Sequence, residues 1–407
     1  MRVKKNKMKG SSPAIKPIAL LVISILASFT ASAVEIYGDE NNQVIVGGRL
    51  QLHVINTQGK TEMANAGSRV RFGFDHKLNN SWVIDTLFEW GVNAVGKTDL
   101  VYSSDSALHA ESDDFLSNRL GYVGFSHENY GRLSFGKQWG VWYDVVGATN
   151  QGMVWDGNAA GVFSYNKGDG AINGVGRSDK IVQYRNSLGA FELAVQAQIK
   201  DELTKLKANG DPINPFPPGS MLNDSFHDTQ VRMYNTYGVA LGYQLGGGWK
   251  LTLGGNTGDI DIIRAGQRQQ QETDYIYGMG ISYGCFGCDG LFAAANYNHN
   301  AWHDTDNLGR MLPKSQGVET WISYQFINGL RPFISYNMLD AGAEYASAYG
   351  GDEFKRQFVF AGLHYQLDRS VTLFLEARKD CSEIHSSLAG MADSEDDGAA
   401  IGVQYNF

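Results

Sequence analysis

The sequence of 407 residues contains little proline, few cysteines and, after residue 33, no long apolar segment. There are 8 prolines and 3 cysteines, against 49 glycines, 20 tyrosines and 20 phenylalanines. A membrane-spanning helix needs roughly 20 consecutive apolar residues, so the sequence excludes a helical membrane protein. Abundant glycine and aromatic residues with so little proline favour a β-sheet protein over a helix bundle.

Positive charge is also scarce beyond the N-terminus. Residues 1–33 hold six of the 34 basic residues and none of the 43 acidic ones, and they consist of a basic start, the apolar run IALLVISILASF and Ala31-Ser32-Ala33. These are the three parts of a secretory signal peptide, so we expect cleavage after Ala33. The remaining chain, 34–407, carries 28 basic and 43 acidic residues, a net charge of −15. This charge argues against nucleic-acid binding as the main function.

Apolar and polar residues alternate along most of 34–407. In the segment 68–75 (SRVRFGFD), for example, Val70, Phe72 and Phe74 share one face and Arg69 and Arg71 share the other. We count 16 such segments, and the chain ends on one of them, AIGVQYNF (400–407). Successive side chains of a strand point to opposite faces, so each segment predicts a strand with one apolar face. No break in composition divides the chain, and we expect one domain.

The connectors between these segments alternate in length. The short ones are 78–81, 128–131, 187–189, 246–248, 285–290, 327–331 and 367–370; the long ones include 94–114, 200–229, 258–273, 300–317, 341–353 and 380–396. Short turns at one end and long loops at the other are typical of outer-membrane barrels, which must close because lipid offers the backbone no hydrogen-bond partner. We therefore predict an all-β fold, a 16-stranded antiparallel transmembrane β-barrel. A soluble all-β protein could alternate too, but it would not need this asymmetry.

Several segments resemble the general diffusion porins of Gram-negative outer membranes. They are VEIYGDENNQVIVGGRL (34–50), SRVRFGFDHKLNNSW (68–82), NRLGYVGFSHENYGRLSFGKQWGVWYD (118–144) and QYRNSLGAFELAVQ (183–196). Phe407 as the last residue, with Tyr405 two positions before it, is similar to the family's assembly signal, which the barrel-insertion machinery reads.

The resemblance implies a homotrimer in the outer membrane, in contact with its lipid and lipopolysaccharide and reached after export through the periplasm. It also implies that the third long loop, here about 144–176, folds into the barrel as a constriction. The expected function is a water-filled channel for passive diffusion of small hydrophilic solutes and ions, with no cofactor.

In that family an arginine cluster on the barrel wall faces acids on the constriction loop. The matching positions are Arg49, Arg71, Arg119 and Arg177. Each lies on the face opposite the outward residues of its strand, so we expect all four to point into the lumen. An arginine facing lipid near the bilayer centre would cost a few kcal/mol, about 2–4.

The predicted loop departs from the family pattern. In NQGMVWDGNAAG (150–161), Asn150 stands where an acid is common and Val154 where a glutamate is expected, which leaves Asp156 as the nearest carboxylate. With four arginines opposed by one acid, the sequence predicts a constriction that leans toward anions.

Trp139, Trp142 and Trp155 in the same region leave an alternative open. Sugar rings stack on exposed aromatic faces, which favours a sugar-preferring channel of the chitooligosaccharide or maltodextrin type. The same residues can instead be membrane-interface aromatics or packing residues of the loop.

The cysteines form a CxxC pair, Cys285 and Cys288, with Cys381 left over. In the oxidising cell envelope a disulfide across this short turn is expected, rather than redox or metal chemistry. No second CxxC and no His pair at zinc-ligand spacing accompanies it, so we predict no metal site. The zinc-protease pattern H-E-x-x-H is absent as well, and we expect no enzymatic activity.

Overall fold

The computed structural model describes residues 33–65, 67–78, 81–100, 114–155, 159–165, 172–206, 229–264, 266–386 and 397–407. Its elements, in chain order, are β1 (Val34–Gly38), β2 (Asn42–Thr57), β3 (Lys60–Asn65), β4 (Arg69–Lys77), β5 (Trp82–Val92), β6 (Leu116–His127), β7 (Gly131–Trp139), α3 (Trp142–Val146), η4 (Gly147–Thr149), β8 (Arg177–Leu188), β9 (Phe191–Gln198), β10 (Glu202–Lys205), β11 (Thr229–Gly246), β12 (Trp249–Arg264), β13 (Gln267–Tyr283), β14 (Gly290–Ala301), β15 (Ser315–Gln325), β16 (Leu330–Asp340), α5 (Gly342–Ala348), β17 (Glu353–Gln366), β18 (Val371–Asp380), β19 (Glu383–His385) and β20 (Gly398–Asn406).

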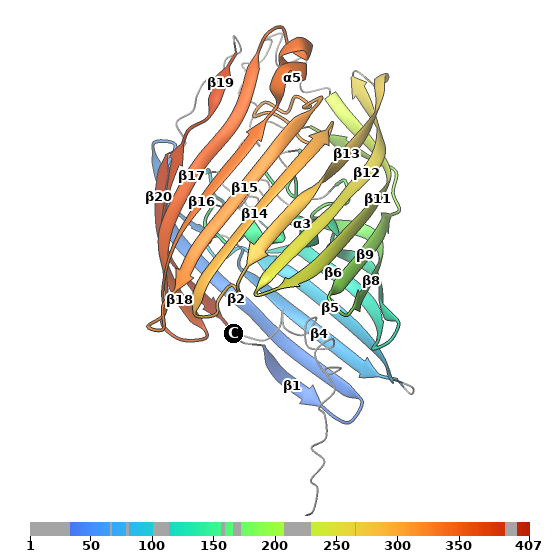
Figure 1. Cartoon of the computed structure of the whole chain (residues 1–407), viewed down its shortest axis with the longest axis vertical. Coiled ribbons are helices and arrows are strands. Elements are labelled where there is room, and N and C mark those ends of the chain that lie inside the picture. The colour runs from blue at the N-terminus through green and yellow to red at the C-terminus, as the bar shows by residue number, and fades with distance from the viewer. Residues whose placement is uncertain are drawn as a thin grey trace, which may run out of the picture.

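These strands form one closed antiparallel barrel (Figure 1). Four couples lie end to end along one neighbour: β3 and β4 along β2, β9 and β10 along β11, β18 and β19 along β17, and β1 and β20 along the other edge of β2. The 20 strands therefore occupy 16 positions around the ring. β20 closes the ring by pairing with β2, from Arg49 opposite Asn406 to Thr57 opposite Gly398. The predicted all-β, 16-stranded barrel is confirmed.

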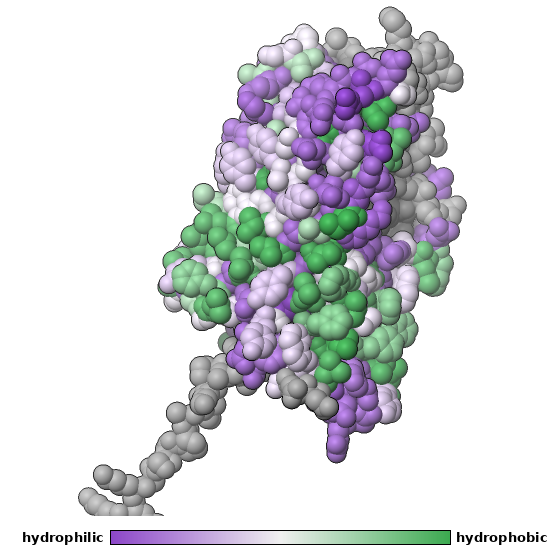
Figure 2. All heavy atoms as spheres, turned by 90° about the vertical axis from the view of Figure 1, so that its right-hand side faces the viewer, coloured by the Kyte–Doolittle hydropathy of each residue, from purple (hydrophilic) through white to green (hydrophobic). Residues whose placement is uncertain are grey.

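The outer face of the barrel is apolar. Phe74, Leu241 and Ile322 are 43%, 50% and 50% exposed, whereas alternate residues on the same strands are buried inside. Figure 2 shows hydrophobic side chains gathered over the lower half of one face, with hydrophilic ones above them. Lipid, rather than protein, covers such side chains in a membrane barrel. Among the described residues no helix has the length and apolar character needed to cross a membrane.

The short connectors all lie at one end of the barrel, as predicted, and this end faces the periplasm in bacterial outer-membrane barrels. The prediction of a long loop at 258–273 is wrong, because β12 and β13 stay paired from Asp259 opposite Thr273 to Arg264 opposite Gln267. Ile260 is buried on the inner side of this hairpin, while Asp259 and Thr273 are exposed. Beyond the bilayer an outer face no longer has to be apolar, so a polar sequence can continue the strands.

Three other predicted loops contain regular elements: β10 lies within 200–229, α5 within 341–353 and β19 within 380–396. The predicted signal peptide lies outside the described residues except for Ala33, as do residues 101–113, 207–228 and 387–396. The sheet itself begins at Val34.

Candidate functional site

Five arginines line one inner wall of the barrel, which we call the basic wall. They are Arg49 on β2, Arg69 and Arg71 on β4, Arg119 on β6 and Arg177 on β8. Arg49 lies directly opposite Arg69 in the sheet register. All four arginines predicted from the sequence are on this wall. Arg69 was missing from that set, although its position two residues before Arg71 places it on the same face.

Glu89 on β5 lies among these arginines. It is 4% exposed, faces Arg71 across the sheet, and binds Arg119 (Nε–Oε1 3.0 Å) and Arg69 (Nη1–Oε1 3.6 Å). Like charges on neighbouring strands repel. The buried carboxylate offsets part of this repulsion and fixes the guanidinium groups on the inner face.

Two further contacts orient the ends of the basic wall. Arg49 donates from Nε to the carbonyl of Gly67 (2.7 Å) and from Nη1 to the side-chain oxygen of Gln404 on β20 (3.1 Å). The guanidinium of Arg177 lies 5.5 Å from the ring centre of Trp139, a distance at which a cation is attracted to an aromatic face. The planar side chains are thus held by partners rather than left to rotate.

The segment that contains the predicted constriction loop crosses the barrel interior. It leaves β7, and the side-chain amide of Gln51 on β2 hydrogen-bonds to the carbonyl of Met153. Glu376 on β18 accepts the backbone N–H groups of Met153 (2.8 Å) and Val154 (3.1 Å). The segment then returns to β8.

A second acid on the inner wall holds the next part of this segment. Glu319 on β15 accepts the backbone N–H groups of Ala159 (2.9 Å) and Ala160 (2.8 Å) and the hydroxyl of Thr149 (2.8 Å). It is 1% exposed. Buried carboxylates that accept backbone N–H groups satisfy donors that the loop itself leaves unpaired.

Apolar side chains fill the barrel interior between this segment and the strands behind it. One cluster joins Trp155 to Trp321, Phe333, Phe360 and Phe374, on β15 to β18. A second joins Val141, Trp142, Val145 and Val146 to Ala194, Ala240 and Ile276, on β9, β11 and β13. Both tryptophans are at most 1% exposed. Their faces are covered, so the structure gives the sugar-preferring alternative no support.

The remaining predicted loop residues have different surroundings. The amide of Asn150 donates to the hydroxyl of Tyr143 (3.4 Å), and Tyr143 stacks on Trp139 with ring centres 4.1 Å apart. Trp139 therefore packs against the segment from within, and is not a membrane-interface residue. Asp156 lies outside the described residues.

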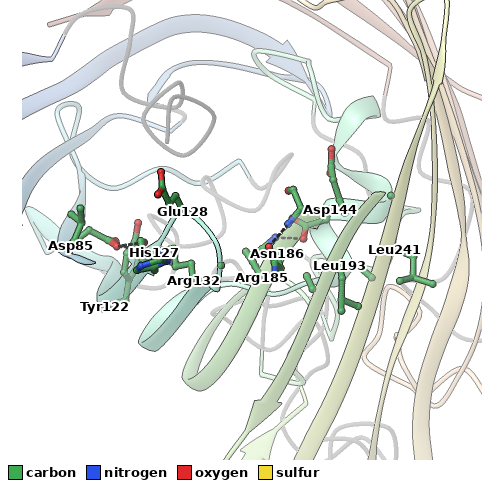
Figure 3. A pocket seen from close by; sticks show the side chains of 18 of the residues that line it. Asp85, Tyr122, His127, Glu128, Arg132, Asp144, Arg185, Asn186, Leu193 and Leu241 are labelled. Atoms are coloured by element: carbon green, nitrogen blue, oxygen red, sulfur yellow. Dashed lines mark hydrogen bonds and ion pairs between the residues drawn. The ribbon is translucent and has the colours of Figure 1, made fainter. Parts of the chain in front are cut away.

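A cavity of about 500 Å³ lies between this segment and the short-turn end of the barrel. Three ion pairs line it: Arg132 with Asp85 (2.6 Å), Lys250 with Glu192 (2.6 Å), and Arg185 with Asp144 of α3. Figure 3 shows the first and the last of these pairs as separate groups across the cavity. This part of the lumen is thus lined by charges of both signs.

The structure also places the predicted cysteines and terminal residues. Cys285 and Cys288 form a disulfide in the turn before β14, and Cys381 is a free, exposed thiol. Tyr405 and Phe407 lie on the outer face, 47% and 38% exposed, with ring centres 6.0 Å apart. Phe407 exchanges two backbone hydrogen bonds with Gly48, at 2.8 and 3.0 Å.

Two short matches to nucleotide-binding and hydrolase motifs occur in the sequence, at 91–98 (GVNAVGKT) and 280–284 (GISYG). A P-loop needs a helix that begins at its Lys-Thr pair, but Thr98 is in irregular chain. A nucleophile elbow needs a strand-to-helix turn, but Ser282 lies within β13. Neither match has the structural context that its chemistry requires.

Comparison with known proteins decides the family, because a family model described as "Gram-negative porin" matches residues 19–384. The chain belongs to the Gram-negative porin family. It is 23% identical to outer membrane protein F of Serratia marcescens, over 96% of this chain and 98% of that protein. The present chain also shares its fold with solved structures.

One is a Salmonella typhi OmpF complex with daunomycin (TM-score 0.64, 19% identity, 92% of this chain and 100% of that chain). Another is OmpT of Vibrio cholerae in a form described as a trimer (TM-score 0.58, 12% identity, 90% and 100%). The protein is thus an outer-membrane porin, a water-filled channel for the diffusion of small hydrophilic solutes.

Proposed function

We propose that solutes pass along the basic wall and that the channel favours anions over cations of the same size. The observation that carries this proposal is the gathering of five guanidinium groups around Glu89, the carboxylate that lies among them in the described part of the chain. Rings of like charge at a narrow point set the charge preference of a pore, since they raise the local concentration of the opposite ion.

The packing of the interior supports this route. The apolar clusters of Trp155 and Trp142 fill interior space against β9 to β18, and the first also reaches Ile55 on β2 and Ala64 on β3. An ion that entered such packing would lose its hydration shell. The basic wall lies on β2 to β8, and the cavity lined by Arg132 and Arg185 at the short-turn end is bounded by these strands and also by β9, β11 and β12. Loop 144–176 would then act as the constriction, with its polar backbone already bound by Glu319 and Glu376.

Planar-bilayer recording tests the proposal. Reversal potentials across a potassium chloride gradient should show anion preference in the native channel. Arg71→Ala combined with Arg119→Ala should move them toward cations. Arg232→Ala is the matched control, because Arg232 pairs with Asp201 on the outer side of β11 and is exposed. An unchanged reversal potential in the double variant would show that ions do not pass along this wall.

Assembly of three copies is part of the proposal. OmpT of Vibrio cholerae, which has the same fold, is described in a trimer form. The apolar outer face fits contact with other copies, with lipid and with lipopolysaccharide. The terminal Tyr405 and Phe407, exposed on that face, fit recognition by the barrel-assembly machinery. We propose no enzymatic activity beside transport, since the two motif matches lie in the wrong structural context.

A further inference from the structure

A carboxylate on the inner face of β13 gathers three hydrogen bonds from separate parts of the chain. Asp274 accepts from the hydroxyl of Tyr165 (2.8 Å), the side-chain amide of Asn173 (2.7 Å) and Nδ1 of His303 (2.6 Å). Tyr165 and Asn173 belong to the second half of the predicted constriction loop, and His303 belongs to the connector between β14 and β15. Asp274 is 2% exposed.

His303 links the same loop to the wall through both of its ring nitrogens. Nδ1 faces the Asp274 carboxylate, and Nε2 lies 2.8 Å from the backbone carbonyl of Gly161. An ionised carboxylate and a carbonyl can only accept hydrogen bonds. A neutral imidazole carries one N–H and the imidazolium carries two. The side-chain amide of Asn173 also lies 3.1 Å from Nδ1. With Asp274 ionised, the contacts to Asp274 and Gly161 are both satisfied only when His303 is protonated, and its side chain is 0% exposed.

We propose that protonated His303, together with Asp274, is a positioning pair that fixes the second half of the constriction loop and thereby the width of the passage. The inference rests on the proposed function, in which this loop sets the constriction. Loss of the proton would leave either the carboxylate or the Gly161 carbonyl without its donor. The first half of the loop would stay held by Glu319 and Glu376, so the loop would loosen without leaving the barrel.

Gly161 makes the contact with His303 possible. Its φ is +64°, in the left-handed region that favours glycine, and a Cβ atom there would lie 2.3 Å from Cδ1 of Ile276 and 3.2 Å from the imidazole. Because Gly161 has no side chain, its backbone can approach the imidazole of His303 closely enough for the 2.8 Å contact. Any other residue would be strained at this φ, and its Cβ would have to displace the tip of the Ile276 side chain.

The charged groups around His303 decide when it loses its proton. Burial lowers the pKa of His303, but the Asp274 ion pair and hydrogen bond, the Gly161 carbonyl and the charge of Asp304 together raise it above its ordinary value of 6.5. Burial also raises the pKa of Asp304, against the charge of Arg356 on β17. Tyr165 remains an O–H donor because burial keeps its pKa well above 10.0.

The sign of the pH effect follows from the raised pKa. A group whose pKa is higher in the folded protein than in the unfolded chain stabilises the fold fully below the unfolded value and loses this contribution as the pH rises through the folded value. The positioning pair is therefore complete below about pH 6.5. It weakens in alkaline solution, once the raised pKa is passed.

Single-channel recording between about pH 5 and 9 tests the inference. The native channel should give a steady open current at the acidic end and a severalfold increase in current noise and substates at the alkaline end. His303→Gln, which offers one donor group in place of two N–H donors, should give the noisy current at every pH. His299→Gln is the matched control, because His299 on β14 lies against the outward rings of Tyr275 and Tyr277. A native current that keeps the same noise from pH 5 to 9, or the same pH profile in His303→Gln, would overturn the inference.

A second measurement does not depend on the folding of a variant. Ring ¹⁵N chemical shifts of the native porin should show His303 as an imidazolium at pH 6.5, the ordinary pKa of histidine. A neutral His303 at pH 6.5 would overturn the inference by itself. The reversal potential in the same recordings reports on the basic wall. Normal anion preference with a pH-independent current would therefore reject the positioning pair alone, whereas lost anion preference would reject the proposed function.

Discussion

The substitution Glu89→Gln tests how the basic wall produces charge selectivity. It removes the carboxylate that lies between Arg69 and Arg119, and it keeps the size of the side chain and an oxygen that can accept the N–H of Arg119. The wall then gains one net positive charge at unchanged shape. We expect a clear increase in the preference for anions.

The size of the effect follows from the distances. Glu89 is 3.0 Å from the guanidinium of Arg119 and 3.6 Å from that of Arg69, so an ion that touches the far side of such a group is about 8 Å from the carboxylate. In water a unit charge at that distance contributes about 0.5 kcal/mol, which is about a 2.4-fold change in ion concentration. The local concentration of anions rises and that of cations falls by this factor, so their permeability ratio should rise about sixfold in dilute salt. Screening should reduce the rise to about twofold near 0.1 M salt.

The assay is the reversal potential in planar bilayers, measured at two ionic strengths. Glu192→Gln is the matched control, because Glu192 pairs with Lys250 at the cavity near the short-turn end and its side chain is 41% exposed. It should shift the reversal potential much less. Heat-modifiable electrophoretic mobility would check that the barrel is folded. If Glu89→Gln leaves selectivity unchanged at low salt, or changes it no more than Glu192→Gln, ions do not pass close to the basic wall and the reasoning fails.

Three further predictions concern the buried ring of Trp155, the disulfide between Cys285 and Cys288, and the C-terminal Phe407. Trp155→Ala should destabilise the barrel by about 3–5 kcal/mol in thermal unfolding, through loss of a fully buried ring; Trp155→Phe should cost far less, because the indole N–H has no hydrogen-bond partner among the described residues. Neither variant should alter blocking by maltodextrins, and a change would restore the sugar-preferring alternative. Reducing the disulfide between Cys285 and Cys288 should lower stability by about 2 kcal/mol, the value for so short a loop, and Cys285→Ser should abolish the response to reductant. Phe407→Ala should lower the folded fraction recovered from outer membranes, whereas the exposed aromatic change Phe326→Ala should not; equal yields would remove Phe407 from the assembly signal.

The barrel could be predicted because each strand carries its own signal, the alternation of apolar and polar residues. Alternation along each strand places Phe72 and Phe74 toward lipid and Arg69 and Arg71 toward water, and no partner needs to be known. Residues 258–273 form a paired hairpin where the sequence predicted a loop, because polar side chains indicate exposure to water and not the end of a strand. Asp259 and Thr273 are exposed yet still paired.

The path of the constriction segment could not be read from the sequence in the same way. It depends on Glu319 and Glu376, which lie more than 150 residues away from the backbone groups that they bind. Trp155 shows the same limit, because a tryptophan in a loop suits solvent, sugar or a packed interior equally well. The aromatic residues of β15 to β18 that cover it decide between these, and they become neighbours only when the barrel closes.

The pairing of β2 with β20, which closes the barrel, affects the permeability of the membrane while the protein is being inserted. Arg49 gains its contact with Gln404 only when residues 355 positions apart have met. An intermediate in which β20 has not yet paired with β2 would be an open sheet that lets ions of either sign pass. Discrimination therefore arises in one step, at the moment the last strand docks.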